Sequence, residues 1–157
     1  MHTRLALVVA SLWLSGTSAS LAAQNAADIA VVVNERNPVN GVTQAELRKI
    51  LAGQRRTWPG GIPVKVIARA PGTRERAALL KVLAMSESDY HRYWTVQVFR
   101  GEAQAEPVVV PSNGMQKEAI RAFPGAITLM GIQDVKVGMK VLRVDGHGPG
   151  DEGYPLR

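Results

Sequence analysis

The apolar residues recur along the chain with two different periods, and these periods predict its secondary structure. Short β-branched runs are typical of buried strands, whereas apolar residues three and four positions apart indicate amphipathic helices. Strands are predicted at 29–33, 63–69, 107–110, 126–130 and 135–144, the last with alternation at Val137, Met139, Val141 and Val144. Helices are predicted from Thr43 to Gly53, over 73–84, from Ser86 onward and from Ser112 to Phe123.

Two of the helix starts have the spacing of a capping box. Thr43 stands three residues before Glu46, and Ser86 stands three residues before Asp89. In this arrangement each side chain accepts a hydrogen bond from the other residue's backbone N–H, which fixes the first turn. These pairs therefore mark the helix boundaries more sharply than the apolar pattern does.

The helical spacing also predicts which side chains are buried. The helix from Ser86 is expected to bury an aromatic face, and the helix from Ser112 is expected to pack on the core through residues four apart. These faces consist of Tyr90, Tyr93, Trp94, Gln97 and Val98 in the first helix and of Met115, Ala119 and Phe123 in the second. The glycine- and proline-rich tail from Asp145 is expected to lie over the surface.

The interleaved order of strands and helices, β α β α α β α β β, favours an α/β sandwich with a mostly parallel sheet. The predicted elements fill one domain, residues 24–157, without internal repeats. Ligands of such sheets bind beyond the carboxyl ends of the strands, at helix N-termini. This rule directs attention to the turn after Arg69 and then to the helix start at 112–114.

Residues 1–23 have the anatomy of a secretory signal peptide. A short start with Arg4 precedes an apolar run over 5–14, and small residues follow up to Ala23. The alternative is a membrane anchor, but the apolar run is shorter than a bilayer span. We therefore expect a cleaved signal and a periplasmic location, and no further segment is long enough to span a membrane.

The 157-residue chain has a formal net charge of +6 and no cysteine. A basic protein can bind nucleic acid, anionic surfaces or small anions, and export disfavours nucleic acid. His91 and His147 lie without clustered carboxylates or thiols, so no metal site or cofactor is predicted. No nucleophile elbow or dinucleotide fingerprint occurs, which favours a protein that is not an enzyme. The loop with Arg55, Arg56 and Trp58 is interpreted as a solvated loop whose tryptophan packs on the preceding helix, rather than as a site that stacks a base or a sugar.

The best candidate for binding is an anion cradle at the turn between the strand at 63–69 and the next helix. Gly72 allows close backbone approach, Thr73 can cap the helix or donate its hydroxyl, and Arg69 and Arg74 supply forked donors. The alternative is an ordinary strand-to-helix turn with solvated or carboxylate-paired arginines. From the residues alone, both interpretations remain open.

The order of these motifs resembles the phosphate-binding proteins of periplasmic ABC uptake systems. The resemblance runs from about Ile29 to Leu156 and implies one lobe of a type II periplasmic-binding-protein fold, a three-layer sandwich with a mixed sheet. It implies that Arg69, Gly72 and Thr73 contact an oxyanion, with Arg74 and Asn113 as further candidates. The matching segments are 37–39, 43–50, Gly53, Trp58, Arg69, 72–75, 113–115, 124–127, 141–146 and 154–156.

Two departures from this family change the functional expectation. Pro71 replaces the phosphate-binding serine, and the chain stops at Arg157, where the family's other lobe would continue. The resemblance then implies weak phosphate or oxyanion binding linked to uptake or sensing, with a membrane transporter, a sensor or a second lobe-like subunit as partner. The alternative is a protein–protein interaction module that retains the lobe fold.

Overall fold

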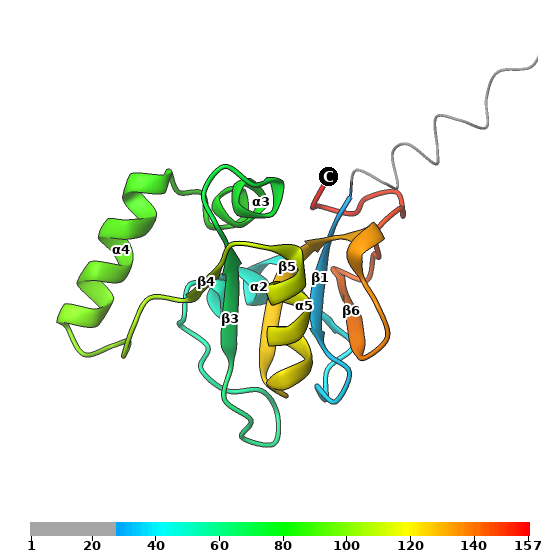
Figure 1. Ribbon diagram of the computed structural model, residues 1–157, viewed down its shortest axis with the longest axis horizontal. Helices are drawn as coiled ribbons and strands as arrows, with labels where there is room; N and C mark the ends of the chain where they lie inside the picture. Colours follow the sequence, from blue (N-terminus) through cyan, green and yellow to red (C-terminus); the bar gives the residue numbers. More distant parts are fainter. Residues whose placement is uncertain (1–27) are drawn as a thin grey trace, which may run out of the picture.

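A six-stranded mixed sheet forms the centre of the computed structural model, which describes residues 28–157 (Figure 1). The predicted signal peptide lies outside the described residues. The strand order is β2-β6-β1-β5-β3-β4. The strands are β1 (Ile29–Asn34), β2 (Gly41–Val42), β3 (Lys65–Arg69), β4 (Val108–Val110), β5 (Ala126–Gly131) and β6 (Met139–Val144).

The central strand β1 runs against all the others. It pairs antiparallel with β5 and with β6, and Val31 lies opposite both Leu129 and Leu142. The remaining neighbours, β2 with β6, β3 with β4 and β3 with β5, are parallel. The predicted mixed, mostly parallel sheet is confirmed.

Helices cover both faces of this sheet, which confirms the three-layer architecture. The helices are α2 (Gln44–Leu51), α3 (Arg74–Leu83), α4 (Glu87–Phe99) and α5 (Asn113–Ala122), followed by the short 3-10 helix η1 (Ile132–Asp134). Alternate residues of β1 enter different cores: Val31 and Val33 pack with α2 and α3, and Ala30 and Val32 pack on the α5 side. This division follows from the two-residue period of a strand.

The two predicted capping boxes are confirmed. The Thr43 hydroxyl accepts from the Glu46 backbone N–H at 3.1 Å, and the Glu46 carboxylate accepts from the Thr43 N–H at 2.9 Å. Ser86 and Asp89 make the equivalent pair at the start of α4. Both helices begin where the sequence pattern places them.

The buried face of α5 was predicted wrongly for Met115 and Phe123, whereas Ala119 is partly buried against the core as expected. Met115 and Phe123 are 50% and 41% exposed, and the helix instead buries Gln116 and Ile120. The Gln116 amide donates to the Thr128 hydroxyl and to the Leu129 carbonyl, each at 2.7 Å. A glutamine occupies the core position because the sheet supplies acceptors for its amide, and apolar periodicity does not register such a residue.

Three other features differ from the prediction: the start of the last strand, an additional short strand and the buried face of α4. The last strand begins at Met139 rather than at 135, because η1 and a turn at Gly138 (φ +88°) precede it and leave Val137 90% exposed. The two-residue strand β2 was not predicted. On α4, Tyr90 and Trp94 are buried as expected, but Val98 is 41% exposed.

The C-terminal tail is not merely a surface segment. The Tyr154 hydroxyl donates to the Ile29 carbonyl at 2.6 Å, and the Leu156 carbonyl accepts from the Ile29 N–H at 3.0 Å. Tyr154 and Leu156 are both buried, and burial raises the pKa of the Tyr154 phenol. The tail thereby closes over the start of β1.

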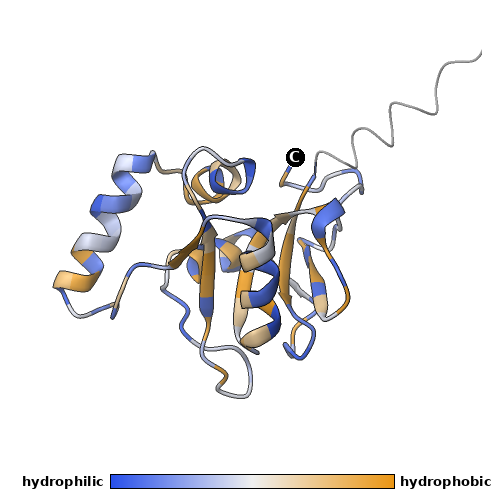
Figure 2. Ribbon diagram, viewed as in Figure 1, coloured by the Kyte–Doolittle hydropathy of each residue, from blue (hydrophilic) through white to orange (hydrophobic). Residues whose placement is uncertain are grey.

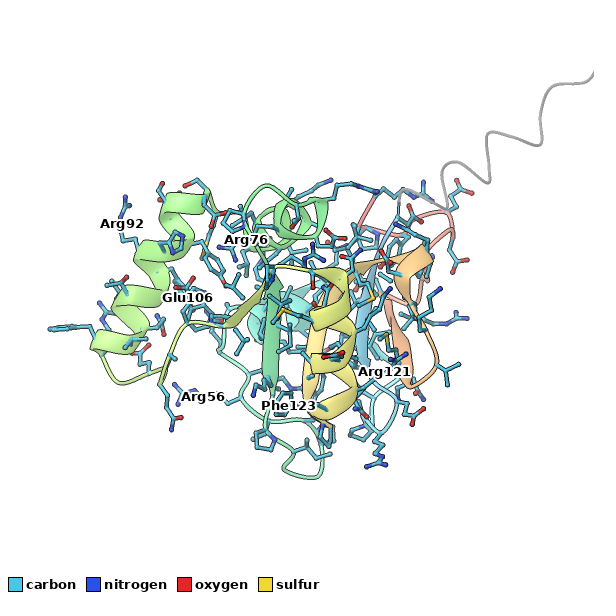
Figure 3. The ribbon with its side chains drawn as sticks, in the orientation of Figure 1. Arg56, Arg76, Arg92, Glu106, Arg121 and Phe123 are labelled. Carbon is cyan, nitrogen blue, oxygen red and sulfur yellow. The ribbon has the colours of Figure 1, made fainter. Side chains whose placement is uncertain are left out.

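A buried arginine on α3 holds the start of α4. The Arg76 guanidinium, 1% exposed as a residue, donates to both carboxylate oxygens of Glu87 and lies 4.0 Å from the Tyr90 ring centroid. Burial raises the pKa of Tyr90 to about 12, so its ring faces Arg76 as a neutral phenol. Arg76 reaches toward α4, whereas Arg92 points away from the body of the molecule (Figure 3).

Glu87→Gln is expected to destabilise the fold at neutral pH by about 2 kcal/mol. Fully buried pairs lose about 3–5 kcal/mol, and the 36% exposure of the Glu87 side chain reduces this loss. The hydrogen bond from Arg76 lowers the pKa of Glu87 from its ordinary 4.5. The stabilisation is therefore present above pH 4.5 and is lost as the pH falls through the lowered folded-state pKa.

Urea unfolding at several pH values measures this effect. The difference between wild type and Glu87→Gln should shrink on acidification, while Glu118→Gln on the exposed side of α5 should have little effect at any pH. A Glu87→Gln deficit that stays constant down to strongly acidic pH would contradict the ion-pair explanation.

Gly125→Ala is expected to destabilise the fold by about 3 kcal/mol. A Cβ at Gly125 would lie 1.8 Å from the Pro63 carbonyl oxygen, and the Gly125 carbonyl accepts from the Trp58 indole at 3.0 Å. Gly114→Ala is the control, since its nearest atom would be the Ser112 hydroxyl at 3.8 Å. Urea unfolding should show a large loss for the first variant and a small change, or a gain, for the second.

Candidate oxyanion site

Two helices begin side by side at the carboxyl edge of the sheet. Strand β3 ends at Arg69 and leads through a short turn into α3, and strand β4 ends at Val110 and leads into α5. The two strands are parallel neighbours, with Arg69 opposite Val110. The helix N-termini and their partial positive charges consequently share one edge, as the sequence predicts (Figure 1).

This edge brings two of the predicted site residues into contact. Arg69 is 9% exposed, and its guanidinium donates from Nη1 to the Asn113 side-chain oxygen. Its Nη2 lies 3.5 Å from the Pro111 carbonyl oxygen. The Nε of Arg69 is buried and has no hydrogen-bond partner among residues 28–157. Arg69 therefore reaches across toward α5 rather than into solvent.

Two residues that the sequence analysis did not identify extend this contact. The Asn113 amide donates to Asp134 Oδ2 at 3.0 Å, and Lys117 Nζ lies 3.1 Å from Asp134 Oδ1. The result is a polar chain from Arg69 through Asn113 and Asp134 to Lys117. Asp134 could have been found, because it follows β5 and the carboxyl end of that strand lies at the same edge.

Thr73 uses its hydroxyl within the protein. The hydroxyl donates to the Ala70 carbonyl at 2.9 Å and accepts from the Arg76 N–H at 3.2 Å, as an N-cap does. Gly72 is exposed at φ +86°, and a Cβ there would meet no atom within 4 Å. The positive φ explains why a glycine occupies this position, and the space next to it is open to a ligand.

Arg74 lies elsewhere. It is exposed and lines a groove between α2 and α3, whereas Arg69 is held against α5. The predicted residues thus form three groups. Arg69 and Asn113 contact each other, Gly72 and Thr73 form the capping turn, and Arg74 is a cation on the surface of α3.

The charges at this edge are of both signs. Arg69 and Lys117 carry positive charge, and Asp134 supplies one carboxylate between Asn113 and Lys117. An anion at this edge would be attracted by the two cations and the helix N-termini but repelled by the Asp134 carboxylate. Within residues 28–157, no group of three or more histidine, aspartate or glutamate side chains is placed to hold a metal ion.

No protein-family model matches the chain. Solved structures do resemble its fold. An ABC-type phosphate transport receptor from Vibrio cholerae has a TM-score of 0.61 and 20% identity over 78% of this chain and 48% of that one. A phosphate ABC transporter substrate-binding protein from Clostridium perfringens, described as putative and solved with bound phosphate, has a TM-score of 0.66 and 18% identity over 82% and 51%.

A third similar structure is PstS from Borrelia burgdorferi, with a TM-score of 0.57 and 18% identity over 78% of this chain and 49% of that one. The chain spans about half the length of these proteins. Helices long and apolar enough to cross a membrane are absent from residues 28–157. The chain has the fold of a single lobe of the phosphate ABC transporter substrate-binding proteins.

Proposed function

We propose that this protein is an exported, non-enzymatic solute-binding-like protein that binds phosphate or a similar oxyanion weakly. The observation that carries the proposal is the contact of Arg69 with Asn113 at the shared N-terminal edge of α3 and α5, in a fold that a phosphate-bound receptor also has. Periplasmic location rests on the signal peptide predicted at residues 1–23. A link to ABC-type uptake or sensing rests on the similar receptors.

The geometry supports binding through Arg69, Asn113 and the open turn at Gly72 and Thr73. An oxyanion at this edge would accept from the guanidinium and from backbone N–H groups of the first turn of α3. Each charge-assisted hydrogen bond contributes about 1.5–3 kcal/mol and a helix terminus up to about 2 kcal/mol. Association costs at least about 4 kcal/mol, so two such contacts give millimolar affinity or weaker.

Asp134→Asn is expected to strengthen phosphate binding several-fold, and Arg69→Lys is expected to weaken it. The first change removes a repelling carboxylate and keeps a side chain of the same shape, and the second keeps the charge but loses the fork. Two-dimensional NMR of the labelled protein, titrated with phosphate to tens of millimolar at constant ionic strength, measures both. Shifts should cluster at Gly72–Arg74 and Asn113.

Arg92→Ala, which removes an exposed arginine of α4, is the control and should give the same phosphate affinity as wild type. Shifts spread over the whole basic surface, or equal affinities for wild type, Asp134→Asn and Arg69→Lys, would show that the edge is not a site. Turnover of phosphate esters by the wild-type protein would contradict the non-enzymatic assignment.

The second candidate function is an interaction module that docks a protein partner in the cell envelope. It is favoured by apolar residues near one end of α4 and on the edge strand β4 (Figure 2). Phe99 is 91% exposed, and Val108 and Val109 are 46% and 45% exposed. The outer edge of β4 has no neighbouring strand in the described sheet. Exposed apolar side chains and an unpaired strand edge are the features through which a protein partner can dock.

Phe99→Glu is expected to abolish capture of a partner from an envelope extract, because a charge would have to be desolvated at the apolar contact. Met115→Glu, a similar change on the 50% exposed Met115 of α5, should leave capture intact. Affinity purification followed by mass spectrometry makes the comparison. Capture that survives both changes, or is lost in both, would contradict docking at α4.

A further inference from the structure

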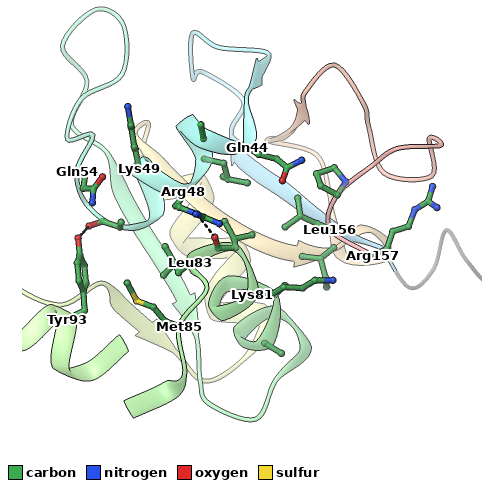
Figure 4. Close-up of a pocket in the computed structure, with 18 of the residues that line it drawn as sticks. Gln44, Arg48, Lys49, Gln54, Lys81, Leu83, Met85, Tyr93, Leu156 and Arg157 are labelled. Atoms are coloured by element: carbon green, nitrogen blue, oxygen red, sulfur yellow. Dashed lines mark hydrogen bonds between the residues drawn. The ribbon is translucent and has the colours of Figure 1, made fainter. Parts of the chain in front are cut away.

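The groove that Arg74 lines lies between α2, α3 and the C-terminal tail, away from the oxyanion edge. Its volume is about 820 Å³, which is within the range of small-molecule sites (Figure 4). The floor is apolar: Leu47, Leu83, Ile29 and Leu156 are each at most 5% exposed, and Val82 and Met85 extend it. The size and lining are those of a ligand pocket rather than of a packing defect.

The rim of this groove is cationic. Arg48, Lys49, Arg74, Lys81 and Arg157 line it, and no aspartate or glutamate side chain among residues 28–157 does so. Glu46 of α2 is engaged elsewhere, with its carboxylate bound to Thr43 and 3.4 Å from Arg55. A ligand that matches the groove is apolar along its length and negatively charged at one end.

The width of the groove limits what can enter it. Helices α2 and α3 contact each other, and Arg48 spans the gap by donating from Nε to the Val82 carbonyl at 2.9 Å (Figure 4). An α-helix with side chains is about 10–12 Å across and needs a wider channel. An extended acyl chain is narrow enough to lie along the apolar floor. A second copy of this chain would bring the same cations and be repelled.

We infer that this groove binds a single-chain anionic amphiphile, with the acyl chain on the floor and the carboxylate among the rim cations. The inference is independent of oxyanion binding at Arg69. Each buried methylene of the ligand should raise the affinity about fourfold until the floor is filled. Lys81 and Lys49 both line the groove and contribute to its positive potential, so a reversal of charge at either position opposes binding.

Fluorescence of dansylaminoundecanoate, displaced by saturated fatty acids, tests this inference. Wild-type protein should bind the probe saturably, and laurate should displace it more strongly than octanoate. Lys81→Glu and Lys49→Glu should weaken laurate binding about tenfold each, and the exposed Lys136→Glu, outside the groove, should not change it. Ala78→Phe, which fills the groove, should abolish binding while the protein stays folded by circular dichroism.

If Ala78→Phe does not fold, the two charge reversals decide the matter. The inference is overturned if dodecyltrimethylammonium displaces the probe as well as laurate does, because the rim charge then plays no part. It is also overturned if the protein binds phosphatidylglycerol vesicles or an acidic helical peptide while monomeric laurate does not compete. Unchanged phosphate titration in Lys81→Glu would show that the groove and the oxyanion edge are separate.

Discussion

The fold depends on one central strand that must be covered on both faces and paired on both edges. All six residues of β1 are buried, and its antiparallel partners β5 and β6 come from the C-terminal part of the chain. The alternate side chains of β1 belong to different cores, so a shift of register by one residue would exchange them. Strand β3 and the edge strand β4 then extend the sheet from β5 in parallel, and this alignment brings the starts of α3 and α5 together.

The parts of the fold that the sequence predicts well are those set by local chemistry. The capping boxes at Thr43 and Ser86 define helix starts, because the reciprocal hydrogen bonds form within four residues. The contact between Arg69 and Asn113 is different: it joins residues 44 apart. The sequence predicts only that the turn after Arg69 and the helix start at 112–114 lie at the same edge, since the carboxyl ends of parallel strands meet there.

The parts that the sequence does not reveal depend on tertiary partners. Gln116 is buried because Thr128 and Leu129 accept hydrogen bonds from its amide. Arg76 is buried because its guanidinium forms an ion pair with Glu87 and lies against the Tyr90 ring. Neither pattern is visible as apolar periodicity. Asp134 was missed because η1, which carries it, lies between the predicted strands 126–130 and 135–144 and was assigned to neither. Gln116 and Arg76 are polar residues whose burial is compensated by partners far away in the sequence.

The closure of the C-terminal tail over β1 has a consequence for the order in which the chain can fold. The hydrogen bond from Tyr154 to Ile29 joins residues 125 apart, and β1 has no partner in the first half of the chain. Contacts between residues so far apart form late in folding, because the entropy cost of closing the long loop comes before the favourable energy of the contact. A growing chain therefore carries an apolar strand with two open edges until β5 and β6 have emerged. Until these partners pair with it, such a strand is a template for aggregation.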